Sequence, residues 1–189
     1  MDRADHRVRR SARRDDAPHP QRRRGRGLGR EAVGLSVTVV VAGRTAPNRA
    51  VRFGGEHDDL DAGGRAALAR IAIPAGPYRV GPELSVVSTA AALGVAVEPD
   101  PSLASLDIGR WRGRAPEDVA ADLPVWFADP DACPHGGESI RAFVARIGAA
   151  VDDGDQVIVA SPVAQALLCA DADRYFAVEV RPASVFDCR

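Results

Sequence analysis

The sequence predicts an α/β fold with a mostly parallel central sheet. Leu35–Ala42 is a continuous β-branched run, the pattern of a strand covered on both faces, and Gln156–Ala160 is a second fully apolar strand. Between them, Ser139–Val151 has the helical apolar spacing Ile140, Phe143, Ile147. Strands that alternate with amphipathic helices indicate a parallel sheet with helical layers.

The remaining elements follow in order along the chain. A helix is predicted over Asp61–Ala72, where the Asp61 side chain can cap the first turn. Leu84–Leu93 is a helix that ends at Gly94. The other predicted helices are Pro116–Asp122 and Val163–Ala170, and the other predicted strands are Tyr78–Val80, Tyr175–Val180 and Val185–Cys188, the last two closing the sheet.

Length and composition indicate one domain. The chain has 189 residues, of which 46% are apolar, and no apolar run is long enough to span a membrane. The three cysteines, Cys133, Cys169 and Cys188, are far apart and form no Cys-x-x-Cys pair. This pattern argues against a disulfide framework and against a zinc site, so we expect reduced thiols in a cytoplasm and no cofactor.

Residues 1–34 form an arginine-rich segment ahead of this domain. Residues 1–30 hold eleven of the 25 basic residues and four of the 26 acidic ones, and every basic residue of the chain is arginine. So few apolar residues predict a disordered tail before a domain at 35–189. A nucleic-acid-binding arm is one interpretation, but no aromatic residue is interleaved to stack on bases. The favoured one is a mis-annotated start, with translation beginning near Val33 or Leu35.

In a parallel α/β sheet, ligands bind beyond the carboxyl ends of the strands. The turns after Val41, Val80 and Val159 are therefore the candidate site. The first turn, VAGRTAPN, contains neither a nucleophile nor a base at Val41 and Ala42.

These turns resemble the histidine phosphatase superfamily, the phosphoglycerate mutase-like proteins. Val41 to Asn48 aligns with the family's Arg-His-Gly-Glu-Thr-x-x-Asn and keeps the glycine, threonine and asparagine. GPELSVVSTA, residues 81–90, aligns with Ser-Pro-x-x-Arg-Ala-x-Gln-Thr-Ala. LASLDIGRWRG (103–113), PHGGES (134–139) and VIVASPVA (157–164) resemble the remaining blocks in the same order. The resemblance implies a three-layer sandwich.

The resemblance also implies which positions carried chemistry. In the family, one histidine attacks the phosphoryl group, two arginines and a second histidine hold the phosphate oxygens, and an acidic residue protonates the leaving oxygen. The aligned positions here hold Ala42 for the nucleophile, Val41 and Ser85 for the arginines, Pro162 for the second histidine and Ser105 for the acid. None of these side chains can perform its role.

Other residues could replace the missing groups. The positions near the former phosphate pocket that could still bind an anion are Arg44, Thr45, Asn48, Arg49 and Arg52. Ordinary surface arginines are the favoured interpretation. His57, with acidic neighbours, could contribute to a metal site, although an exposed acidic loop is favoured. His135 is expected to face solvent in a turn.

Two functional hypotheses follow. The first is a pseudophosphatase, bacterial and cytoplasmic, that binds a phosphorylated small molecule or a protein partner. The second is an active phosphomonoesterase or phosphoglycerate mutase-like enzyme that uses substituted groups. Fold alone does not decide between them. The sequence names no partner, and nothing in it indicates membrane binding.

Overall fold

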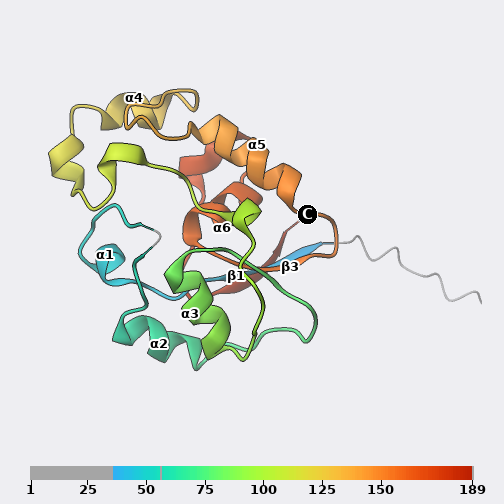
Figure 1. Ribbon diagram of the computed structural model, residues 1–189. Helices are drawn as coiled ribbons and strands as arrows, with labels where there is room; N and C mark the ends of the chain where they lie inside the picture. Colours follow the sequence, from blue (N-terminus) through green and yellow to red (C-terminus); the bar gives the residue numbers. More distant parts are fainter. Residues whose placement is uncertain (1–35, 56, 189) are drawn as a thin grey trace, which may run out of the picture. The chain divides into compact units, whose positions relative to one another are not determined.

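A computed structural model of the chain describes residues 36–55 and 57–188 (Figure 1). The arginine-rich segment 1–34 lies outside the described residues, so its disorder and the domain boundary at residue 35 remain predictions. The α-helices are α1 Ala46–Arg49, α2 Ala62–Leu68, α3 Leu84–Ala92, α4 Leu123–Ala128, α5 Ile140–Ala150 and α6 Ser161–Leu168. The described residues also form 3₁₀ helices, at Pro101–Leu103, Gly109–Trp111, Pro116–Val119 and Ala172–Ala177.

The sheet has the strand order β2-β3-β1-β4. The strands are β1 Val37–Val41, β2 Arg79–Val80, β3 Gln156–Val159 and β4 Val185–Cys188. β3 pairs in parallel with both β1 and β2, and β4 pairs antiparallel with the other edge of β1. The predicted α/β fold with a mostly parallel sheet is confirmed.

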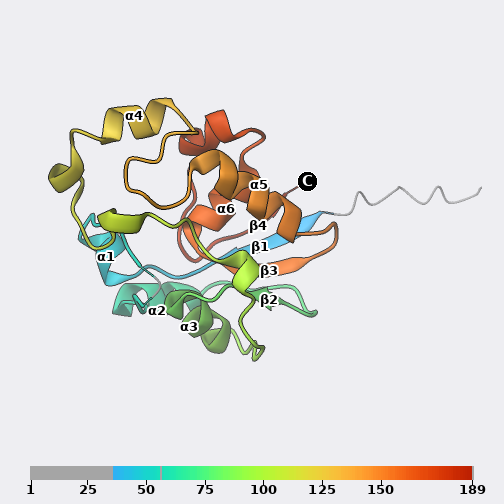
Figure 2. The same cartoon turned by 45° about the horizontal axis from the view of Figure 1, so that its top comes forward.

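Helices cover both faces of this sheet, because its apolar strand residues alternate between the two sides. Val39, Val41 and the neighbouring Val157 and Val159 pack with α5 and α6 in the larger apolar cluster. Val40 and Ile158 face the opposite side and pack with side chains of β2 and α3. Figure 2 shows α2 and α3 on one side of the sheet and α5 and α6 on the other.

Side-chain caps place the starts of α2 and α5 where the sequence predicts them, although α2 ends at Leu68, before the predicted Ala72. The Asp61 side chain accepts a hydrogen bond from the Gly64 amide at 2.6 Å, and the Ser139 hydroxyl accepts one from the Ala142 amide at 3.2 Å. Gly94 follows the end of α3 with φ of 78°, a backbone conformation that favours glycine. None of the described helices has the length and apolar character to cross a membrane.

Two predicted elements are wrong. The predicted strand Tyr175–Val180 is replaced by the 3₁₀ helix Ala172–Ala177. β4 occupies the edge of β1 at which another strand could pair, and Tyr175 is instead buried in the larger apolar cluster. The predicted helix Pro116–Asp122 forms only one 3₁₀ segment, Pro116–Val119, before α4 begins at Leu123.

Candidate functional site

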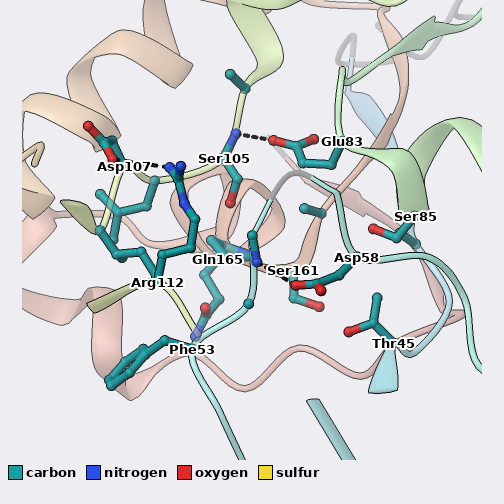
Figure 3. A pocket seen from close by; sticks show the side chains of 18 of the residues that line it. Thr45, Phe53, Asp58, Glu83, Ser85, Ser105, Asp107, Arg112, Ser161 and Gln165 are labelled. Carbon is teal, nitrogen blue, oxygen red and sulfur yellow. Dashed lines mark hydrogen bonds and ion pairs between the residues drawn. The ribbon is translucent and has the colours of Figure 1, made fainter. Parts of the chain in front are cut away.

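A cavity of about 710 Å³ opens beyond the carboxyl ends of the parallel strands (Figure 3). Each strand of the parallel set contributes the residues that follow it: Ala42 and Gly43 after β1, Pro82 and Glu83 after β2, and Ala160 to Pro162 after β3. Residues 52–55 with Asp58, and residues 104–108 with Arg112, form further walls. We call this cavity the cleft.

Four of the five positions aligned with family catalytic residues line the cleft. They are Ala42, Ser85, Ser105 and Pro162. The fifth, Val41, is not among the lining residues; its side chain is fully buried in the cluster beneath α5 and α6. The structure therefore brings together four segments that are far apart in sequence. The side chain of Val41, in contrast, packs in the apolar core and does not face the cleft.

The backbone of this region is held by residues that the resemblance marks as retained. The Gly43 amide donates a hydrogen bond to Thr89 Oγ1 at 3.0 Å, and the Thr89 hydroxyl donates to the Ser85 carbonyl at 2.7 Å. A Cβ at Gly43 would lie 2.9 Å from Leu60 Cδ2, so the turn packs closely against its neighbours. These contacts join the turn after β1 to α3, whatever chemistry the cleft performs.

The candidate anion-binding residues are only partly brought together. Thr45 and Arg52 line the cleft, and Arg52 donates to the Gly113 carbonyl at 3.2 Å. Arg44 does not line the cleft; its guanidinium pairs with Asp61 at 3.0 Å. The side chains of Asn48 and Arg49 lie outside the described residues.

Sequence reasoning named Arg52 but missed the other charged groups of the cleft. Among the described residues, the carboxylates of Asp58, Glu83 and Asp107 line it, together with the guanidinium groups of Arg52 and Arg112. Both arginines are exposed, and Arg112 pairs with Asp107 at 3.4 Å. The sequence could have indicated Glu83. This acidic residue directly follows Pro82 and lies two residues before Ser85, the position at which the family has an arginine.

Glu83 lines the cleft and is buried, with 6% of its surface exposed. It precedes α3, and one of its carboxylate oxygens accepts a hydrogen bond from the Ser105 amide. Its charge also contributes to raising the pKa of the Arg146 guanidinium, although the hydrogen bonds from Arg146 to Glu138 are the largest cause. Asp58 is half-buried and accepts from the Gly55 amide at 2.6 Å.

An aromatic wall forms another side of the cleft. It consists of Phe53, Trp126, Tyr175 and Phe176. The ring centroids of Trp126 and Phe176 are 4.7 Å apart in a T-shaped contact, and those of Phe53 and Trp126 are 6.1 Å apart. Burial raises the pKa of the Tyr175 phenol, which therefore stays protonated and donates to the Pro162 carbonyl at 3.4 Å.

The two histidines outside the arginine-rich tail do not line the cleft. The prediction that His135 faces solvent is wrong, because only 1% of its surface is exposed. Its ring packs T-shaped against Trp111 and Trp126, and Nδ1 accepts from the Gly137 amide at 3.1 Å. Burial lowers its pKa, so the imidazole is neutral at pH 7.

The predicted metal site at His57 is only partly within the described residues, because its neighbour Glu56 is not described. In the described part, no group of three or more His, Cys, Asp or Glu could hold a metal ion.

Comparison with known proteins agrees with this geometry. The sequence model of the histidine phosphatase superfamily (branch 1) matches residues 85–171, which include Ser85, Ser105 and Pro162 but not the turn after β1. No curated protein matches the chain.

Several solved structures share the fold. The protein TTHB049 from Thermus thermophilus is 25% identical, with a TM-score of 0.67 over 81% of this chain and 92% of its own. A phosphoglycerate mutase from Thermus thermophilus is 24% identical, with a TM-score of 0.66 over the same shares. Mycobacterial hydrolase 1 is 21% identical, with a TM-score of 0.64 over 82% of this chain and 90% of its own.

Proposed function

Starting from the assignment of this chain to the histidine phosphatase superfamily, which the family match and the shared fold support, we propose that it is a pseudophosphatase: a binding protein that has lost phosphoryl transfer. The observation that carries this proposal is the cleft itself. Ala42, Ser85, Ser105 and Pro162 line one cavity, and each aligns with a family residue whose chemistry it cannot perform.

Phosphoryl transfer to a side chain requires a nucleophile close to phosphorus and cations that absorb the developing charge. Among the described residues, no histidine, cysteine or lysine lines the cleft. Serine and threonine hydroxyls are weak nucleophiles without an adjacent base. The two cleft arginines are exposed, and Arg112 has Asp107 as an ion-pair partner, which reduces its effect on a phosphate.

The residues that are retained around the cleft support a binding role, because they still hold the cleft open in the folded protein. Gly43 and Thr89 still join β1 to α3, and the cavity has a size typical of small-molecule sites. We therefore assign the chain a binding or regulatory role in the cytoplasm. The free thiols of all three cysteines fit a reducing compartment.

The alternative is an active phosphomonoesterase that uses substituted groups. Its supporting observation is that carboxylates and guanidinium groups do meet in the cleft, so that Asp58, Glu83 or Asp107 could act as a nucleophile or acid. Such an enzyme would have to balance the phosphoryl charge with arginines that are exposed to solvent, since the described lining of the cleft includes no buried cation.

The experiment is a p-nitrophenyl phosphate assay of the full chain, with and without Mg²⁺. We expect release of p-nitrophenol at the uncatalysed rate. Asp58→Asn, Glu83→Gln and Asp107→Asn are assayed beside it, with Asp153→Asn as the matched control, because Asp153 is exposed and precedes β3 at the opposite end of the strands. Turnover that one of the three cleft variants abolishes and the control retains would establish the active enzyme.

A further inference from the structure

The aromatic residues of the chain gather around the cleft. All of them lie in the part of the chain that the structure describes, and all except Tyr78 and Phe186 belong to one connected group of ring contacts. Trp111 and Phe143 are fully buried and belong to the core, whereas the aromatic wall is the part of the group that lines the cavity. Aromatic residues make up only 5% of the sequence, so their concentration at one cavity indicates a role beyond core packing.

Two rings of the aromatic wall, Phe53 and Phe176, offer surface to a ligand. Both line the cleft and are only partly buried, whereas Trp126 and Tyr175 keep just 6% and 3% of their surface exposed. The Trp126 ring contacts both, with its centroid 6.1 Å from that of Phe53 and 4.7 Å from that of Phe176. Trp126 therefore links the two rings into one continuous apolar surface.

Hydrogen bonds hold the segments that carry these two rings. The Phe53 amide donates to the Arg114 carbonyl at 2.9 Å. Phe176 belongs to a 3₁₀ helix, and the Gln165 side chain donates to the Val178 carbonyl at the end of that helix at 2.9 Å. A ligand that meets rings already held in position loses less free energy to ordering them.

Uncharged polar side chains line the cleft beyond the rings. In Figure 3, Phe53 and Ser85 lie on opposite sides of the pocket, and Ser105, Ser161 and Gln165 lie between them in this view. Hydroxyl and amide groups can both donate and accept hydrogen bonds. Small-molecule sites combine aromatic surface with a few such groups, and the cavity of about 710 Å³ has room for a ligand of two fused rings.

We propose that the cleft binds a planar aromatic molecule that carries a hydrogen-bonding group such as a hydroxyl. The ring system of the ligand lies against Phe53 and Phe176, and its hydroxyl group points to the serine hydroxyls of the cleft. Aromatic rings attract one another beyond the area that they bury, so an aromatic ligand gains more from this wall than a saturated ligand of the same skeleton. This inference deepens the proposed binding role of the cleft and rests on it.

Two uncharged probes with the same skeleton test the ligand class: 2-naphthol and its saturated counterpart, decahydro-2-naphthol. Because neither probe carries a charge at pH 7, their comparison does not depend on the charged groups of the cleft. Binding to the full chain is followed by NMR through the indole N–H signals of the two tryptophans. Trp126 lines the cleft, whereas Trp111 is fully buried and serves as the internal reference. We expect 2-naphthol to bind about fivefold more tightly than decahydro-2-naphthol and to shift the Trp126 signal more than the Trp111 signal.

Phe53→Leu and Phe176→Leu remove one ring each and keep an apolar side chain. Each should weaken 2-naphthol by about fivefold and leave decahydro-2-naphthol nearly unchanged. Phe186→Leu is the matched control, because Phe186 is also partly buried but lies on β4 and does not line the cleft. It should leave both affinities unchanged. Circular dichroism checks folding, and if one cleft variant unfolds, the other makes the same comparison.

Three results would overturn the inference: no binding of 2-naphthol, equal affinity for the two probes, or a loss in Phe186→Leu as large as in the cleft variants. These measurements concern equilibrium binding of molecules without a phosphate group, so their failure leaves the proposed loss of catalysis intact. Turnover of p-nitrophenyl phosphate would instead refute that loss, whatever the affinity for 2-naphthol.

Discussion

Thr89→Val tests whether the retained family residues hold the cleft together. Thr89 is fully buried, and its hydroxyl accepts from the Gly43 amide and donates to the Ser85 carbonyl. Valine has nearly the same shape but cannot take part in either bond, so the buried Gly43 N–H loses its acceptor. A buried donor left without a partner costs about 1 to 3 kcal/mol, and we expect a free energy of unfolding lower by about 2 kcal/mol.

Urea denaturation followed by circular dichroism measures this change. With a slope of about 2 kcal/mol per molar urea, the midpoint should fall by about 1 M. Thr38→Val is the matched control, because the Thr38 hydroxyl donates to Asp187 at 2.7 Å in a hydrogen bond that is exposed to solvent. An exposed bond of this kind contributes less, and valine suits a strand. Equal midpoint shifts in the two variants would refute the role assigned to the buried hydrogen bonds.

Two further predictions concern stability. Arg79 pairs with Asp100 at 2.6 Å and with Asp155 at 2.8 Å, and it also donates to the Ala150 carbonyl. In urea denaturation, Arg79→Met should therefore lower the free energy of unfolding by about 2 kcal/mol. The control Arg70→Met, at an exposed arginine, should leave the free energy of unfolding nearly unchanged. His135 has a folded pKa below its ordinary value of 6.5 because it is buried, so its neutral form stabilises the fold above that pH and stability falls as the pH drops below it. An NMR titration in which the His135 ring protons shift with a midpoint at or above 6.5 would contradict this.

The sequence predicts the central sheet and its helices well because their signals are local. Val37–Val41 and Gln156–Val159 are apolar runs that form buried strands in any compact fold, and Asp61 and Ser139 cap helices through their own side chains. The strand predicted at Tyr175 fails because β4 already pairs with the open edge of β1. His135 is buried because Trp111 and Trp126 pack around it, a contact that no local pattern reveals.

The cleft, too, could be predicted where local motifs define it and could not be predicted where distant residues meet. Motif alignment predicts which turns meet, and four of the five aligned positions do line one cavity. The Val41 side chain does not line the cleft because successive residues of a strand face opposite sides: Val41 packs in the larger apolar cluster, whereas Ala42 packs in the cluster on the opposite side of the sheet and lines the cleft. The aromatic wall escaped prediction because it joins residues 53, 126, 175 and 176, which only the folded chain brings together.

The most direct test of the proposed loss of catalysis compares the natural chain with a variant that carries the family's catalytic groups at the aligned positions. This variant carries Ala42→His, Ser85→Arg, Ser105→Glu and Pro162→His; Val41 stays unchanged, because an arginine there would enter the apolar core. Both proteins are assayed with p-nitrophenyl phosphate after circular dichroism has shown that they are folded. The account predicts turnover at the uncatalysed rate for the natural chain and a faster rate for the restored variant. Turnover by the natural chain above the uncatalysed rate, abolished by Glu83→Gln or Asp58→Asn, would contradict it.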